Sequence, residues 1–70
     1  MRITINGEAR HLNDDAVAID TVAALVAALG LPAERVAIEH NGAIVRRPDR
    51  SSTPVADGDV FEIVTLVGGG

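Results

Sequence analysis

Apolar and polar residues alternate at the start of the chain and predict a β-hairpin. Arg2-Ile3-Thr4-Ile5 alternates between the two kinds and is rich in β-branched residues, and Glu8 to Leu12 resumes an extended pattern. Between them, Asn6-Gly7 supplies two positions that accept a positive φ, as a two-residue hairpin turn requires. The chain therefore begins with two antiparallel strands joined by a tight turn.

A helical period replaces this alternation after the polar break Asn13-Asp14-Asp15. Four apolar residues recur among alanines at the spacing i, i+3, i+4 and i+7, namely Val22, Leu25, Val26 and Leu29. Asp20 or Thr21 can cap the first turn, because a short polar side chain accepts a hydrogen bond from the free N–H groups there. Gly30 accepts a left-handed conformation and Pro32 cannot continue a helix, so the helix ends there. We predict one amphipathic helix with one apolar stripe.

A second pair of short strands follows the helix. Val36 to His40 alternates again, Asn41-Gly42 provides another turn, and Ala43 to Val45 is a short apolar stretch. Arg46 to Pro54 is rich in Arg, Pro, Ser and Asp without periodicity. That segment predicts a surface loop with room for one helical turn.

The last strand, Val60 to Val64, follows a tight turn at Asp57-Gly58-Asp59 and is the most apolar. A single helix covers one face of one sheet, so the first hairpin and the last strand must share that sheet. We predict an α+β fold in which the last strand runs parallel to the first within a mixed sheet. The positions expected to face the helix are Ile3, Ile5, Val22, Leu25, Val26, Leu29, Val36, Ile38, Phe61 and Ile63. The positions expected on the opposite face are Thr4, Ala37, Glu39, Glu62 and Val64.

Composition narrows the classes of function. Ten acidic residues against six arginines, with no lysine, give a net charge of −4, and Phe61 is the single aromatic residue. Nucleic-acid binding needs a basic stripe and usually aromatic faces for the bases, so we expect basic or apolar protein partners instead. No apolar run reaches about eighteen residues and no signal sequence opens the chain, so we expect no membrane span and a cytoplasmic protein. Cysteine is absent, which excludes disulfides and thiolate sites.

The side chains offer little catalytic or metal-binding chemistry. Ser51 and Ser52 lie in a polar loop without the surroundings of a hydrolytic nucleophile. His11 and His40 lie at different strand ends without the spacing of metal ligands, so we expect surface imidazoles and no metal site.

Two charged clusters also favour structural interpretations. Asp57 and Asp59 flank Gly58, and such a pair serves turn chemistry before acid–base chemistry. Arg46, Arg47 and Arg50 gather in one loop, where we expect solvated side chains that could meet an acidic partner surface.

The chain ends in Gly68-Gly69-Gly70 directly after the last strand. One interpretation is a frayed terminus. The other is that a free carboxylate on Gly70 is the reactive group, since a tail without Cβ atoms can thread into a narrow active site. Composition leaves both interpretations open. We expect a folded domain over residues 1–67 and a flexible glycine tail over residues 68–70.

A resemblance to a known family favours the second interpretation. The motifs that carry it in the C-terminal half are Asn41-Gly42, Ile44-Val45, Arg47, the segment from Ser52 to Asp59, Glu62-Ile63-Val64 and Val67-Gly68-Gly69-Gly70. In the N-terminal half, Ile3-x-Ile5-Asn6-Gly7-Glu8 and the helix end Ala27 to Leu31 fit as well. Over nearly its whole length the chain resembles the ThiS family, the sulfur-carrier proteins of thiamine biosynthesis.

The resemblance implies a β-grasp, ubiquitin-like fold and a carrier that is not itself an enzyme. A ThiF-type enzyme would adenylate Gly70 with ATP and Mg²⁺, and a sulfur donor system would then displace AMP to leave a thiocarboxylate. A ThiG-type thiazole synthase would consume that sulfur. The carrier would bind no cofactor and would be a monomer when free. The residues expected to meet these partners are Val64, Leu66, Val67, Gly68 and Gly69.

The chain departs from the family pattern at two places, and alternatives stay open. Arg46 and Arg50 stand where relatives often have Pro and Trp, and the connection from Leu12 to Thr21 is slightly long. One alternative is the small subunit of molybdopterin synthase, but Thr65-Leu66 stands where that family carries a Pro-Pro pair. The others are a β-grasp interaction module without a carrier role and a ubiquitin-like protein modifier.

Overall fold

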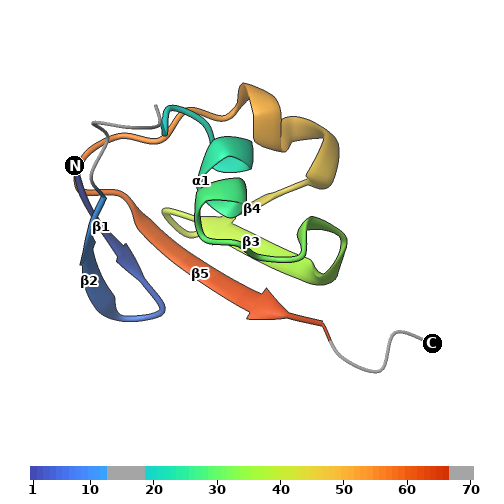
Figure 1. Cartoon of the computed structure of the whole chain (residues 1–70), viewed down its shortest axis with the longest axis horizontal. Helices are drawn as coiled ribbons and strands as arrows, with labels where there is room; N and C mark the ends of the chain where they lie inside the picture. Colours follow the sequence, from blue (N-terminus) through green and yellow to red (C-terminus); the bar gives the residue numbers. More distant parts are fainter. Residues whose placement is uncertain (13–18, 67–70) are drawn as a thin grey trace.

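The computed structural model describes residues 1–12 and 19–66 and contains five strands and one α-helix (Figure 1). Its elements are β1 (Arg2–Ile5), β2 (Glu8–His11), α1 (Val22–Ala28), the 3₁₀ helix η1 (Ala33–Arg35), β3 (Val36–His40), β4 (Ala43–Val45), the 3₁₀ helix η2 (Arg47–Ser52) and β5 (Val60–Thr65). The predicted polar break at 13–15 and the tail over 68–70 lie outside the described residues. None of the described helices is long and apolar enough to cross a membrane.

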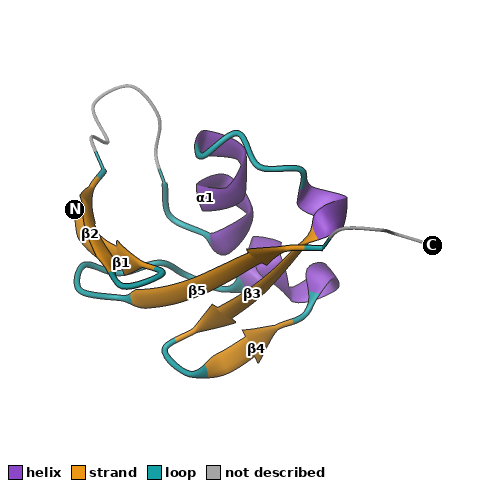
Figure 2. Ribbon diagram, turned by 90° about the horizontal axis from the view of Figure 1, so that it is seen from below, coloured by secondary structure: helices purple, strands orange, loops and turns teal. Residues whose placement is uncertain are grey.

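The five strands form one mixed sheet in the order β2-β1-β5-β3-β4. β1 and β5 are parallel neighbours, with Ile5 opposite Phe61, whereas β5 pairs antiparallel with β3. Both predicted hairpins are present, and each turns at an Asn-Gly pair with positive φ. The predicted mixed sheet with parallel first and last strands is therefore confirmed. Figure 2 shows α1 packed across one side of this sheet.

The helix begins and ends where its sequence signals lie. Of the two candidate caps, Thr21 is the N-cap, and its Oγ1 accepts a hydrogen bond from the Ala24 N–H at 3.1 Å. At the other end Gly30 adopts a φ of +69°, which an L side chain tolerates poorly. The seven-residue helix is short because this stop comes two turns after its start.

The core lies between α1 and the sheet, and Phe61 at its centre is completely buried. Eight of the ten positions expected to face the helix are buried, and the other two, Leu29 and Ile63, are only partly buried at the margin of the core. Leu29 is the C-cap residue, just beyond the last residue of α1. The core also contains Ile19 and Val45, which the periodicity did not indicate.

The loop between β4 and β5 departs from its prediction at one residue. Residues 47–52 form η2, as the expected helical turn, and Arg46 and Arg47 are exposed. Arg50, however, is only 7% exposed and donates hydrogen bonds to the carbonyl oxygens of Ala33 and Val36 at 2.8 and 2.7 Å. The expectation of a solvated cluster is wrong for Arg50, because its guanidinium joins η2 to the start of β3.

Candidate functional site

The C-terminal end of β5 is held by hydrogen bonds at both of its edges. On the β3 side the Leu66 N–H donates to the carbonyl oxygen of Arg35. On the β1 side the amide of Asn6 donates to the Ile63 carbonyl oxygen at 2.9 Å and accepts from the Ile63 N–H at 2.8 Å. The last described residues before the glycine tail therefore leave the domain from a fixed strand.

Asn6 extends the pairing of β1 by one residue through its side chain. β1 ends at Ile5, and Asn6 turns the chain away with a φ of +51°. Its side-chain amide carries one acceptor and two donors, so it can replace a backbone partner for Ile63. The sequence predicted Asn6 only as a turn residue, because a contact across 57 positions leaves no local signal.

Arg50 supports the opposite edge of β5 indirectly. Its two hydrogen bonds hold the carbonyl oxygens of Ala33 and Val36, which flank the carbonyl of Arg35 that receives Leu66. The buried guanidinium therefore helps to position η1, where the strand end is anchored. The sequence placed Arg50 in a loop cluster and gave no sign of this role.

The open face of the sheet carries a patch of apolar and acidic side chains. Ile44, Glu39 and Glu62 occupy one row across β4, β3 and β5, because Ile44 pairs with Glu39 and Glu39 pairs with Glu62. Ala37 and Val64 pair in the next row. A shallow hollow of about 140 Å³ lies among these residues. We call Ala37, Glu39, Ile44, Glu62 and Val64 the open-face patch.

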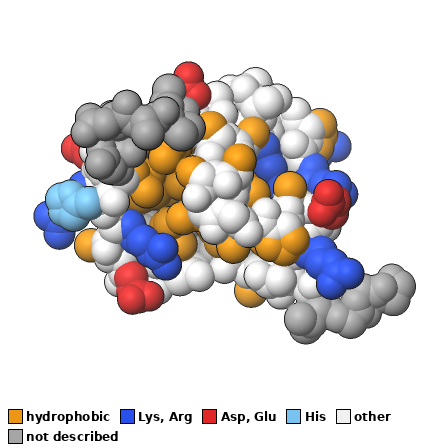
Figure 3. Space-filling model, in the orientation of Figure 1, with side chains coloured by type: hydrophobic (Ala, Val, Ile, Leu, Met, Phe, Trp, Pro, Cys, Tyr) orange, Lys and Arg blue, Asp and Glu red, His pale blue; other side chains and the backbone are white. Residues whose placement is uncertain are grey.

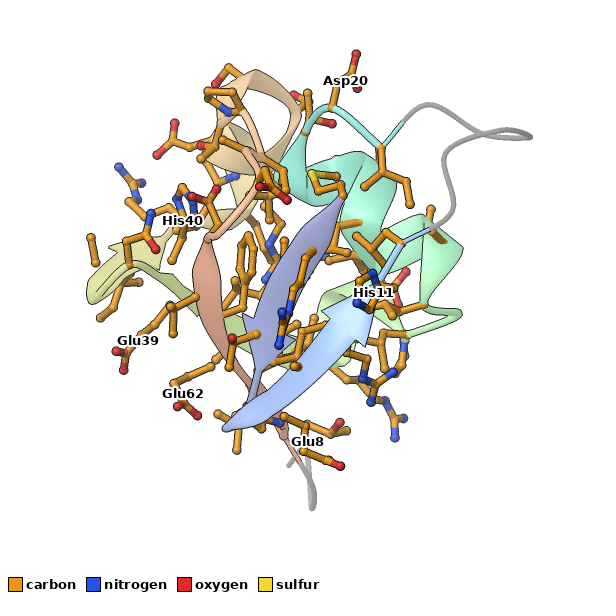
Figure 4. All side chains as sticks on the ribbon, turned by 90° about the vertical axis from the view of Figure 1, so that its left-hand side faces the viewer. Glu8, His11, Asp20, Glu39, His40 and Glu62 are labelled. Atoms are coloured by element: carbon orange, nitrogen blue, oxygen red, sulfur yellow. The ribbon has the colours of Figure 1, made fainter. Side chains whose placement is uncertain are left out.

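The open-face patch is suited to a basic and apolar protein surface. Ile44 is 77% exposed and Val64 is 61% exposed, so both offer apolar contacts without disturbing the core. Glu39 and Glu62 lie near one another on the same side of the sheet (Figure 4), and two adjacent carboxylates favour a cationic partner group. The predicted outward facing of Val64 is confirmed, and Ile44 is a surface residue that the sequence interpretation missed.

Leu66 extends this surface toward the chain end. Of the residues predicted to meet partners, Val64 and Leu66 are described, and Leu66 is 55% exposed. The other predicted site residues are Val67, Gly68, Gly69 and Gly70, and they lie outside the described residues.

His40 and Asp59 form an ordered polar network at the start of β5. His40 Nε2 lies 2.7 Å from Asp59 Oδ2, and the imidazole stacks on Phe61 with ring centroids 4.8 Å apart. The Asp59 carboxylate also accepts hydrogen bonds from the Ala56 N–H and from the amide of Asn41. The expectation of a plain surface imidazole is therefore wrong for His40, whereas the turn chemistry predicted for Asp59 is confirmed.

This network changes the acidity of Asp59. Burial alone raises the pKa of the Asp59 carboxyl, but three hydrogen bonds and the charge of a protonated His40 outweigh it. The donors are the Ala56 N–H and the side chains of His40 and Asn41, and the net effect is a lowered pKa. Such bonds stabilise the ionised carboxylate, so Asp59 is a structural anion rather than a proton donor.

The other candidate polar residues do not come together. His11 is exposed on β2, and Figure 4 shows it well apart from His40. The Ser52 hydroxyl donates to the Asp49 carbonyl oxygen and caps its own turn. Among residues 1–12 and 19–66, no group of three or more His, Asp or Glu side chains could hold a metal ion.

Comparison with known proteins gives the family. The sequence model of the ThiS family matches residues 3–70. The chain belongs to the ThiS family. The crystal structure of the thiamine biosynthesis protein ThiS from Geobacter metallireducens matches with a TM-score of 0.80 at 35% identity, over 100% of both chains. The β-grasp architecture of this ThiS-family chain, predicted from the resemblance, is confirmed.

Two curated relatives of the ThiS-family chain are larger proteins. The thiazole synthase of Paramagnetospirillum magneticum is 41% identical over 70 residues, which are 100% of this chain and 20% of that protein. The thiazole synthase of Magnetococcus marinus is 36% identical over the same share of each chain. The chain thus spans about one-fifth of the length of the curated relatives that it matches.

Proposed function

We propose that this ThiS-family chain carries sulfur for thiazole formation in thiamine biosynthesis, with the carboxylate of Gly70 as the reactive group. The observation that carries the proposal is the family match, which runs through the glycine tail to residue 70. The anchored end of β5 supports it, because a reactive tail needs a rigid domain from which to reach a partner's active site.

The chemistry follows from the weakness of a carboxylate as an electrophile. A ThiF-type enzyme would transfer AMP from ATP to the Gly70 carboxylate, releasing pyrophosphate and forming a mixed anhydride. Hydrosulfide supplied by a sulfur donor system would attack the carbonyl carbon, and AMP would leave with the electron pair of the broken C–O bond. The product is a thiocarboxylate, whose sulfur is a better nucleophile than any side chain of a chain without cysteine.

The domain would contribute recognition rather than catalysis. An activating enzyme that grips Gly70 must also grip the rigid domain nearby, since the glycines themselves offer no side chains. Val64 of the open-face patch and Leu66 are exposed apolar side chains close to the start of the tail. Val67, Gly68 and Gly69 would then thread into the partner's active site.

The thiazole synthase assignment rests on the relatives. Two thiazole synthases contain a segment similar to the whole of this chain. We propose that a ThiG-type synthase consumes the sulfur of the thiocarboxylate. A carrier for molybdopterin synthesis would share the activation chemistry, and it is distinguished by which enzyme system the thiocarboxylate restores.

Intact-mass measurement tests the proposal. The mass of the protein isolated from its source first shows whether Gly70 carries a free carboxylate. Incubation with the ThiF-type enzyme of the same organism, ATP and a sulfur donor should then exchange one oxygen for sulfur at the terminus. A control protein with one extra residue after Gly70 should bind the enzyme and stay unmodified. Formation of the AMP adduct without sulfur exchange would contradict sulfur carriage and favour protein conjugation.

A further inference from the structure

A second hollow lies on the helix side of the molecule, away from the open-face patch. It has a volume of about 400 Å³ between α1 and η2, within the range of small ligand sites. Its apolar lining includes Ala23, Val26, Ala27 and Leu31, and its polar side is formed by Arg47 and Arg50. Figure 3 shows arginine and apolar side chains next to one another over this part of the surface. We call it the helix-side hollow.

Arg50 brings an unbalanced buried charge to the helix-side hollow. Arg50 is buried, and its two hydrogen bonds go to neutral carbonyl oxygens. Its Nε atom has no hydrogen-bond partner among the described residues. Among residues 1–12 and 19–66, the ion pair that is present joins His40 to Asp59. No described carboxylate therefore forms an ion pair with Arg50. A buried cation without a counter-charge is unfavourable, and an anion placed nearby would offset that cost.

We propose that the helix-side hollow binds an acidic, aliphatic segment of a partner protein. An aliphatic side chain would lie against Val26, Ala27 and Leu31. A neighbouring carboxylate would pair with the exposed Arg47 and with the positive field of Arg50. Charge complementarity selects this occupant, because the described lining contains two arginines and no acidic residue on a chain of net charge −4.

The helix-side hollow and the open-face patch therefore have opposite chemistry. The open-face patch carries Glu39 and Glu62, whereas the helix-side hollow carries Arg47 and Arg50. Because the two surfaces lie on opposite sides of the sheet, a partner on one leaves the other accessible. This assignment goes beyond the proposed function, since it involves neither Gly70 nor its activation.

Binding is tested by NMR on the ¹⁵N-labelled protein. The probe is the blocked peptide Leu-Glu-Leu, and its matched control is Leu-Gln-Leu. The acidic peptide should shift the amides of Ala23, Ala27, Leu31 and Ser51 saturably and bind at least about tenfold more tightly than the control, which corresponds to about 1.4 kcal/mol. Arg47→Glu should abolish this preference. Arg2→Glu should leave it intact, because Arg2 is exposed and alternates with the buried Ile3 and Ile5, so it faces away from the helix. Equal binding of both peptides, shifts at the open-face patch alone, or no shifts would overturn the proposal.

A second measurement tests the unbalanced charge without any ligand. Ala27 lines the helix-side hollow in the last turn of α1, where the helix dipole disfavours an acidic residue. We nevertheless expect Ala27→Glu to melt at a higher temperature than Ala27→Gln, and we expect Arg47→Gln to remove most of that difference. A lower melting temperature for Ala27→Glu than for Ala27→Gln would contradict the charge argument.

Discussion

The pairing of Asn6 with Ile63 can be tested by changing Asn6 to Gly. The Asn6 amide provides both hydrogen bonds that Ile63 makes on the β1 side. Gly adopts the φ of +51° without strain, so Asn6→Gly removes the amide and keeps the turn. Asn6→Asp is the matched variant, because it keeps the Oδ1 acceptor for the Ile63 N–H and loses the donor to the Ile63 carbonyl oxygen.

The expected cost follows from these two bonds. Each contributes about 0.5–1.5 kcal/mol net, so Asn6→Gly should lower the free energy of unfolding by about 1–3 kcal/mol. A domain of this size has only about 3–5 kcal/mol of stability, so the loss should be large. It should lower Tm by about 4–8 °C per kcal/mol.

Urea unfolding followed by circular dichroism measures the stability, and amide hydrogen exchange locates the change. In Asn6→Gly the Ile63 amide should lose protection, whereas in Asn6→Asp it should stay protected because its acceptor remains. The Val60 amide, which donates to Asn41 Oδ1, is the internal control and should be unaffected beyond the global loss. The role of Asn6 would be refuted if Asn6→Gly unfolded with a free energy within about 0.5 kcal/mol of that of the unchanged protein and kept the Ile63 amide protected. A change of that size is what an ordinary surface substitution produces.

Three further predictions concern the network, the core and the open-face patch. Because folding lowers the pKa of Asp59, ionisation of its carboxyl stabilises the fold above about pH 4. That contribution is lost as the pH falls through the pKa of Asp59 in the folded protein. Asp59→Asn should therefore flatten the fall in stability between about pH 5 and 2, and equal acid profiles of the two proteins would contradict this. Phe61→Ala should cost about 3–5 kcal/mol and unfold much of the protein at 25 °C, seen as loss of NMR dispersion; native-like dispersion would show that the core tolerates the cavity. Val64→Asp should keep the circular dichroism spectrum of the fold and raise the carrier concentration needed for half-maximal adenylation; an unchanged concentration would place the docking surface elsewhere.

Local patterns in the sequence predicted most of the fold. The Asn-Gly pairs at 6–7 and 41–42 predicted both hairpins, because few other dipeptides adopt positive φ at both turn positions. Period-two alternation correctly placed Phe61 in the core and Val64 on the exposed face, since successive strand residues point to opposite faces of a sheet. Because a single amphipathic helix covers only one face of one sheet, the first hairpin and the last strand had to share a sheet, and β5 does lie beside β1.

The sequence also suggested where the function lies. The glycine tail by itself left two interpretations open, a frayed terminus and a reactive carboxylate on Gly70. The resemblance to the ThiS family then favoured the second interpretation. The tail itself lies outside the described residues, so the role of Gly70 stays a prediction that the mass measurement decides.

Tertiary structure alone decided the contacts that hold the strand before the tail and the charge of the two surfaces. Asn6 meets Ile63 across 57 positions, His40 meets Asp59 across 19, and Arg50 meets Val36 across 14. No periodicity links such residues, because each pair depends on which strands become neighbours and at what register. The three arginines of residues 46–50 look alike in the sequence, yet η2 packs against α1 and buries Arg50, whereas Arg46 and Arg47 stay exposed. Burial depends on what covers a side chain, and the sequence near Arg50 does not contain that information.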